Sequence, residues 1–189
     1  MISKFATMAL AASALSLGGC VTTGPMDSSE LSYVGGAAMY PAKNIVENAV
    51  NSPDHTTLVA AVKAAGLVDT LSSPGPFTVF APTNTAFAKL PAGTVDTLLL
   101  PQNLSTLQSV LTYHVVPGRL TAADLMRMIA AGGGQARLTT AQGAVLTARM
   151  MGDTIILIDS KGGMSHVTQG NVMQSNGVIH VVDAVMMPS

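Results

Sequence analysis

The sequence predicts an α+β fold, in which helices from the first half of the chain pack on a β-sheet from the second half. Two patterns carry this prediction: apolar residues recur at helical spacing between residues 44 and 129, and short apolar runs separated by Gly-rich turns follow from residue 137. In addition, 48% of the 189 residues are apolar and only 10% are charged. One domain with a sizeable core is therefore expected.

The aromatic residues are concentrated in one short segment. Three of the four phenylalanines lie between residues 77 and 87, and the chain has no tryptophan. We expect a strand over 77–81 that ends at Pro82, which has no N–H to donate to a sheet. Thr83 then suits the N-cap of a helix that ends before Pro91. This strand, stop and helix predict one corner of the core, formed by Phe77, Phe80 and Phe87.

The remaining elements follow from local signals. Helices are expected over 44–51, 53–65, 102–112 and 121–129, with Gly66 ending the second and a capping box of Thr121 and Asp124 opening the fourth. Strands are expected over 137–140, 144–150, 154–159, 171–174 and 178–187, with a tight turn at Ser175–Gly177 before the last.

Two further motifs, Tyr113-His-Val-Val-Pro-Gly118 and Asn176-Gly-Val-Ile-His-Val-Val-Asp-Ala-Val-Met-Met-Pro188, follow the phenylalanine segment. In this order and spacing, the three segments resemble the fasciclin (FAS1) domain over residues 42–188. The resemblance implies a fasciclin-like fold of helices on a β-sheet wedge. It also implies a module without enzymatic activity, with no catalytic residues, that acts in adhesion or cell-surface association by binding a cell-surface or matrix protein or a glycan.

The resemblance also implies a candidate partner surface, made of Thr83, Asn84, Tyr113, His114, Asn171 and Val172. In animal relatives the Tyr-His region has been implicated in integrin contact, and an Asp-Ile pair serves adhesion. Here that pair is Asn171-Val172, so the carboxylate that an integrin metal would bind is missing. The residues allow a second interpretation of His114, as a buried imidazole hydrogen-bonded to a backbone carbonyl.

The N-terminus predicts export. Lys4 is followed by an apolar run over 5–17 and then by Leu17-Gly-Gly-Cys20, which suits a signal peptide over residues 1–19. Small residues before the only cysteine resemble a bacterial lipobox, so Cys20 is the predicted lipidation site and the membrane anchor; a free thiol in a secreted protein is the alternative. Val21 after the cysteine favours the outer membrane. Residues 20–41 are expected to be a flexible tether.

Several kinds of site find no support. The net charge is −1 without any run of Lys or Arg, which excludes nucleic-acid binding. No cofactor or metal is expected, because the four histidines lack ligand spacing. We expect His55 to be exposed, His180 to be a hydrogen-bonded histidine of the core or of a sheet edge, and the methionines to fill gaps in the core. The alternative function is a periplasmic lipoprotein that binds a small ligand or a metal in stress protection; the sequence leaves self-association open.

Overall fold

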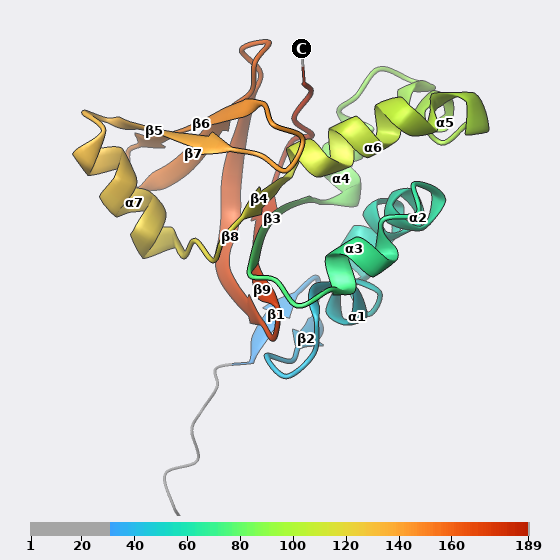
Figure 1. Cartoon of the computed structure of the whole chain (residues 1–189), viewed down its shortest axis with the longest axis horizontal. Helices are drawn as coiled ribbons and strands as arrows, with labels where there is room; N and C mark the ends of the chain where they lie inside the picture. The colour runs from blue at the N-terminus through green and yellow to red at the C-terminus, as the bar shows by residue number, and fades with distance from the viewer. Residues whose placement is uncertain (1–30, 189) are drawn as a thin grey trace, which may run out of the picture.

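The computed structural model describes residues 31–188, in which helices cover a curved seven-stranded sheet (Figure 1). Helices α1 to α6 lie on one side of the molecule, and α7 lies on the other. The helices are α1 (Ile45–Ala49), α2 (Thr56–Ala64), α3 (Val68–Ser72), α4 (Asn84–Ala88), α5 (Thr94–Leu98), α6 (Leu104–Tyr113) and α7 (Ala122–Ala131). The predicted α+β fold is confirmed.

The sheet has the order β4-β3-β9-β8-β7-β6-β5, and a separate hairpin pairs β1 with β2. The strand β3 runs parallel to β9, and the other neighbours are antiparallel. The sheet nearly closes, since Ala141 beyond β5 donates its N–H to the Val115 carbonyl of β4 at 2.7 Å. The strands are β1 (Ser32–Val34), β2 (Ala37–Met39), β3 (Phe77–Pro82), β4 (Val115–Pro117), β5 (Gln135–Thr139), β6 (Val145–Met151), β7 (Thr154–Ile158), β8 (Met164–Gln174) and β9 (Gly177–Val182).

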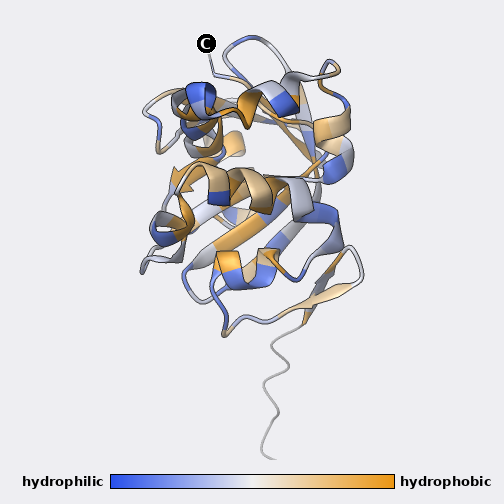
Figure 2. Cartoon of the chain, turned by 90° about the vertical axis from the view of Figure 1, so that its right-hand side faces the viewer, coloured by the Kyte–Doolittle hydropathy of each residue, from blue (hydrophilic) through white to orange (hydrophobic). Residues whose placement is uncertain are grey.

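The predicted phenylalanine corner forms, but its rings do not share one core. The strand β3 and the helix α4 lie where expected, and the Thr83 hydroxyl accepts the Ala86 N–H at 3.2 Å. Phe87 and the half-buried Phe77 pack in the core under helices α1 to α6, whereas Phe80 belongs to a second core under α7. Alternation along a strand explains the difference, because residues 77 and 80 point to opposite faces of β3. Figure 2 shows hydrophobic residues concentrated where helices meet strands.

One buried side chain joins the two halves of the chain. Asn176, between β8 and β9, accepts the Ile45 N–H at the start of α1 at 3.0 Å. Its amide nitrogen donates to the carbonyls of Leu71 and Ser73 at the end of α3, at 2.8 and 3.0 Å. The backbone carbonyl of Asn176 also accepts the Phe77 N–H at 3.0 Å, where β3 begins. A turn residue in the sequence is therefore the joint between helices and sheet.

The prediction of a flexible tether over residues 20–41 is wrong for residues 32–39. Residues 32–39 form the β1–β2 hairpin, whose Val34 and Met39 side chains are 4% and 2% exposed. The hairpin was missed because its two strands have three residues each and enclose the Gly35-Gly36 turn, a composition that favours a linker. The signal peptide, Cys20 and residues 20–30 of the tether lie outside the described residues.

Local signals predicted most helices well, including the Thr121–Asp124 capping box and the turn at Gly66, which has a φ of 68°. The short helices α3 and α5 were missed. Strand β8 begins at Met164 rather than Asn171, because its polar first half is held by pairing with β7 and not by an apolar pattern. Strand β9 ends at Val182 rather than Met187, since its partner β3 ends at Pro82.

Phe80 gives the first testable prediction. Its side chain is fully buried and stacks on His180 with 5.6 Å between the ring centroids. We expect Phe80→Ala to lower the free energy of unfolding by about 3–5 kcal/mol through the loss of apolar contact and the cavity that remains. Urea denaturation measures the change, with Phe77→Ala as the half-buried comparison. An equal loss in the two variants would contradict the assignment of Phe80 to the core under α7.

Candidate functional site

Tyr113 and His114, the centre of the predicted partner surface, are buried. Tyr113 is 0% exposed, and its hydroxyl donates to the Val145 carbonyl and accepts the Ser160 N–H, both at 3.1 Å. His114 is 2% exposed and donates from Nδ1 to the Val110 carbonyl at 2.7 Å. Neither side chain reaches a partner from this position. The surface role predicted for this pair is wrong, and the interpretation of His114 as a buried, satisfied imidazole is confirmed.

The second hydrogen bond of His114 fixes its charge state. Its Nε2 accepts the Met186 N–H at 3.0 Å, so the ring needs a bare nitrogen there and a proton on Nδ1. This arrangement requires the neutral form. Burial lowers the pKa of His114 to about 4, partly opposed by the hydrogen bond to Val110. His114 thus ties the C-terminal segment to the end of α6.

Thr83 and Asn84 are half-buried and hold helices together. Beyond the Thr83 cap of α4, the Asn84 side chain accepts the Thr57 N–H at 3.0 Å, within the first turn of α2. Its amide nitrogen donates to the Pro53 carbonyl at 2.8 Å. Asn84 therefore joins α4 to the start of α2, and its hydrogen-bonding groups are used inside the fold.

The third predicted pair divides between surface and core. Asn171 is exposed, has a φ of 60°, and accepts the Ala122 N–H at the start of α7 at 2.7 Å. Val172 is 0% exposed and lies in the core under helices α1 to α6. Three of the six predicted residues, Tyr113, His114 and Val172, are thus buried. The other three, Thr83, Asn84 and Asn171, each accept an N–H at the start of a helix. The six do not form one exposed surface.

The other histidines contribute to the interior as well. His180 is 0% exposed, as predicted, and donates from Nε2 to the Leu120 carbonyl at 2.8 Å. The prediction that His55 is exposed is wrong, since it is 3% exposed with Nδ1 2.9 Å from the Ser52 hydroxyl. A short 3-10 helix over Pro53–His55 turns this ring inward, which helical periodicity did not indicate. Burial lowers the pKa of both rings.

Most of the methionines are more exposed than predicted. Met186 is 1% exposed and fills the core as expected. Six of the others that fall in or beside the predicted elements are between 36% and 54% exposed, namely Met126, Met128, Met150, Met151, Met164 and Met173. Their exposure could not be predicted from the sequence, because neighbouring positions on a strand or helix point to different faces and only the folded structure shows which face is covered.

A polar groove lies beside the Asn176 joint. It has a volume of about 490 Å³ and is lined by Asn44, Ser72, Pro74, Gly75, Pro76, Arg119, Ser175 and Asn176. Its wall is fixed by close backbone contact, since a Cβ on Gly75 would lie 2.2 Å from the Asn176 carbonyl oxygen. The groove is thus a preformed part of the fold.

Arg119 is the charged residue of this groove. Its guanidinium lies 3.4 and 3.5 Å from the carbonyl oxygens of Gln174 and Ser175, and within residues 31–188 it forms no ion pair. Arg119 also lines a second hollow of about 490 Å³ along α7, together with Leu120, Asp124, Arg127, Met128 and Ala131. The two hollows therefore meet at an arginine whose charge is not neutralised by a carboxylate.

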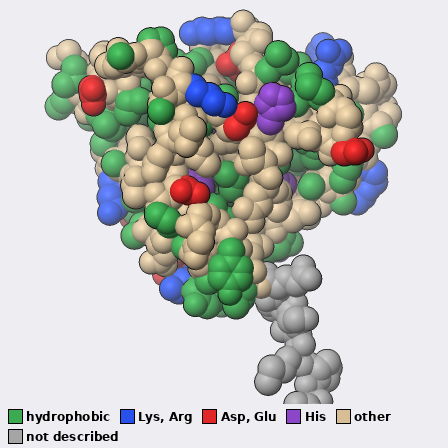
Figure 3. Space-filling model, turned by 180° about the vertical axis from the view of Figure 1, so that it is seen from behind, with side chains coloured by type: hydrophobic (Ala, Val, Ile, Leu, Met, Phe, Trp, Pro, Cys, Tyr) green, Lys and Arg blue, Asp and Glu red, His purple; other side chains and the backbone are tan. Residues whose placement is uncertain are grey.

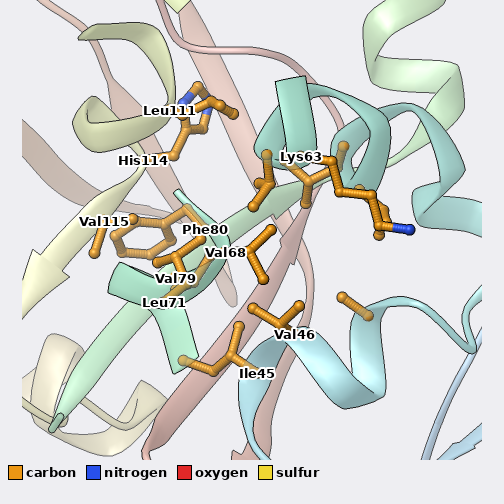
Figure 4. A pocket seen from close by; sticks show the side chains of 14 residues that line it. Ile45, Val46, Lys63, Val68, Leu71, Val79, Phe80, Leu111, His114 and Val115 are labelled. Atoms are coloured by element: carbon orange, nitrogen blue, oxygen red, sulfur yellow. The ribbon is translucent and has the colours of Figure 1, made fainter. Parts of the chain in front are cut away.

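Two apolar cavities lie between the helices and the sheet, and both are small. The first, of about 40 Å³, is bounded by residues of α1, α2, α3 and β3, including Val46, Val68 and Phe80 (Figure 4). The Lys63 ammonium group at its edge points away from it. The second has about 30 Å³. Pockets for organic ligands have roughly 300 Å³ or more, so these cavities are gaps in packing.

In the part of the chain that the structure describes, no three His, Cys, Asp or Glu side chains gather into a possible metal site. Within the same residues, no helix has both the length and the apolar character needed to span a membrane. The groove at Arg119 is the candidate site that remains. The sequence signal that could have indicated this groove is Arg119 itself, which directly follows the Tyr113–Gly118 motif.

The buried histidines predict a specific dependence of stability on pH. In the unfolded chain a histidine has a pKa near 6.5, so between pH 6.5 and 4 the unfolded state binds more protons than the folded state. The free energy of unfolding should therefore be highest above pH 6.5 and fall as the pH drops toward 4, with His114 alone accounting for about 3 kcal/mol. Urea denaturation across this range measures the slope.

The matched variants are His114→Gln and His166→Gln, the latter at a half-exposed position. His114→Gln should flatten the slope more than His166→Gln does, whatever its effect on stability at pH 7. Equal slopes in the wild type and in His114→Gln would show that the buried ring is not held neutral.

Comparisons with known proteins agree with this fold. The Fasciclin domain model matches residues 53–188. The chain is 46% identical to protein sll1483 of Synechocystis sp. over 169 residues, which cover 89% of this chain and 87% of that protein. It is 41% identical to the immunogenic protein MPB70 of Mycobacterium bovis over 145 residues, covering 74% and 66% of the two chains.

A third relative is the cell surface glycolipoprotein MPB83 of Mycobacterium bovis, with 34% identity over 188 residues, covering 89% of this chain and 78% of that protein. Among solved structures, a FAS1 domain pair from the insect cell adhesion molecule Fasciclin I is similar, with a TM-score of 0.67, 19% identity, and coverage of 76% of this chain and 50% of that one. The chain therefore belongs to the fasciclin (FAS1) domain family.

Proposed function

We propose that this protein is a non-enzymatic binding module of the bacterial cell envelope, which a lipid on Cys20 holds at the membrane. Its partner is a cell-surface or matrix protein or a glycan. The lipobox-like sequence before Cys20 supports the anchor, and the similarity to MPB83, a cell surface glycolipoprotein, supports the location. Adhesion is the role that both features favour.

The observation that carries the binding proposal is Arg119, which has no carboxylate partner among residues 31–188 and lies in a rigid polar groove. A guanidinium binds a carboxylate with two parallel N–H···O bonds, and such charge-assisted bonds are about twice as strong as neutral ones. The groove also offers Ser72 and Ser175 and the exposed faces of Pro74 and Pro76. We therefore assign it to a partner that presents a carboxylate, on an acidic sugar or on an Asp or Glu side chain.

Preformation makes this groove suited to binding. The Asn176 hydrogen bonds and the contact at Gly75 hold both walls in the folded protein. A rigid site loses less conformational freedom when a partner binds, so more of the contact energy appears as affinity. The six residues predicted from the family resemblance stabilise the fold. We therefore propose Arg119, rather than those residues, as the contact with the partner.

The alternative function, binding of a small ligand or metal in stress protection, has weaker support. The two apolar cavities are too small for an organic ligand, and the described residues gather no metal set. Mass spectrometry of the native protein, with metal analysis after dialysis, addresses it directly. A stoichiometric organic molecule or metal would favour the alternative over adhesion.

Adhesion of a deletion strain that carries Arg119 variants tests the groove. Arg119→Ala should weaken attachment, with a loss of partner affinity of roughly tenfold if one charge-assisted contact disappears. Arg137→Ala removes an exposed arginine from β5 and serves as the matched control. If both variants attach as the wild type does, the groove is not the binding site, and equal losses in both would indicate a nonspecific effect of charge.

The anchor has its own test. Cys20→Ser should move the protein from the membrane fraction to the soluble fraction, because the acylated thiol is lost. Mass measurement of the wild-type chain should find the acyl group on Cys20. A Cys20→Ser protein that stays in the membrane fraction would contradict the lipid anchor.

A further inference from the structure

The β1–β2 hairpin has an outer face that is apolar and aromatic. Its register pairs Ser32 with Met39 and Tyr33 with Ala38, so alternation places Leu31, Tyr33, Ala38 and Tyr40 on the side away from the core. Leu31, Tyr33 and Tyr40 are 43%, 59% and 45% exposed. Viewed from behind, the end of the molecule next to the grey segment carries a group of hydrophobic side chains (Figure 3).

The hairpin presents this face in a fixed position. Val34 and Met39 anchor its inner side in the core. The backbone of Tyr40 is held from both directions by Asn48, which accepts its N–H at 3.0 Å and donates to its carbonyl at 2.8 Å. Gln169 of β8 donates to the Tyr33 carbonyl at 2.9 Å. These bonds fix the backbone of both tyrosines and leave their rings exposed.

The position of this face in the chain indicates what covers it. Leu31 follows the predicted lipid site Cys20 by only ten intervening residues. Even fully extended, that length of chain spans at most about 40 Å, so an anchored domain keeps the hairpin near the bilayer. A short tether gives an effective concentration in the millimolar range, at which a weak surface contact becomes populated.

The chemistry of the face also suits a bilayer surface. Tyrosine has an apolar ring and a polar hydroxyl, and it is enriched where hydrocarbon meets headgroups. The Lys43 ammonium lies 5.1 Å from the centre of the Tyr40 ring. Glu47 caps α1 next to Lys43, and Asp54 lies beside the hairpin turn at Gly35. These three charges sum to −1 and form no basic patch, so apolar contact rather than charge must dominate the interaction.

We infer that the outer face of the β1–β2 hairpin, formed by Leu31, Tyr33 and Tyr40, rests on the membrane that holds the lipid of Cys20. This inference rests on the proposed anchor. It makes the hairpin a second membrane contact that orients the domain, in place of a domain that hangs freely on its linker. Because apolar contact leads, the interaction should occur on zwitterionic and anionic lipid alike and depend little on salt.

The absence of tryptophan from the chain allows a clean test. Tyr40→Trp introduces a single fluorescent reporter next to the hairpin. Met164→Trp introduces a control reporter at a position that is 54% exposed, at the start of β8. The other end of β8 leads into the turn at Ser175, whose N–H donates to the Lys43 carbonyl. The chain from Cys20 onward, which retains every described residue, is coupled through its only thiol to a maleimide lipid in phosphatidylcholine vesicles, with or without phosphatidylglycerol. Quenching by iodide is then compared before and after coupling.

On coupling, iodide quenching of Tyr40→Trp should fall severalfold with both lipid compositions, while that of Met164→Trp should not change. Adding Tyr33→Ser should restore quenching of the Tyr40→Trp reporter. Equal quenching of the two reporters on vesicles would overturn the inference. So would protection of Tyr40→Trp without lipid as protein concentration rises, because the face would then bind a second copy of the chain.

This design separates the inference from the proposed anchor. Chemical coupling places a lipid on Cys20 whether or not cells acylate it. If the protein lacks the acyl group in cells but its hairpin docks when Cys20 is coupled to lipid, the proposed anchor is wrong and the docking face stands. An acylated protein whose hairpin reporter stays open to iodide would keep the anchor and remove the docking face.

Discussion

The hydrogen bonds of the Asn176 side chain are the constraint on which the rest of the structure depends. Asn176 is 8% exposed, and its side-chain amide joins two segments, the start of α1 and the end of α3, that lie more than 100 residues before it in the chain. It satisfies the first N–H of α1 and two carbonyls at the end of α3, groups that helix ends leave without intrahelical partners. A buried N–H or carbonyl without a partner costs about 1–3 kcal/mol, so few side chains could replace it. Aspartate has the right shape but no N–H to donate to the two carbonyls.

The glycines around this joint follow from the same geometry. A Cβ on Gly177 would lie 2.0 Å from the Phe77 carbonyl oxygen, and one on Gly75 would meet the Asn176 carbonyl. Strands β3 and β9 thus approach the joint so closely that side chains are excluded there. The result is a rigid end of the sheet, and the polar groove with Arg119 is its outer surface. The proposed contact site is therefore a consequence of how the two halves are held together.

Those parts of the fold that depend on neighbouring residues could be predicted from the sequence. The Thr83 cap, the Thr121–Asp124 capping box and the end of α2 at Gly66 each need only a few adjacent residues. Features that depend on distant partners could not. The first half of β8 is polar and exists because β7 pairs with it, and the hairpin is held by Val34 and Met39 in a core assembled from later elements. The same limit applies to the site: the family resemblance implied a surface at Tyr113 and His114, but their hydrogen-bond partners Val145, Ser160 and Met186 come from far along the chain and hold both side chains in the interior.

Native-state hydrogen exchange of the wild type and of Asn176→Ser tests the central role of this joint most directly. In the wild type, the Ile45 amide should exchange as slowly as the core strands, because it opens only when the fold opens. In Asn176→Ser, the amides of α1 should exchange much faster while those of β8 and β9 stay protected, since the helix has lost its hold on the sheet. Unchanged protection of Ile45 in the variant, with the fold intact, would contradict the claim that this one amide joins helices to sheet.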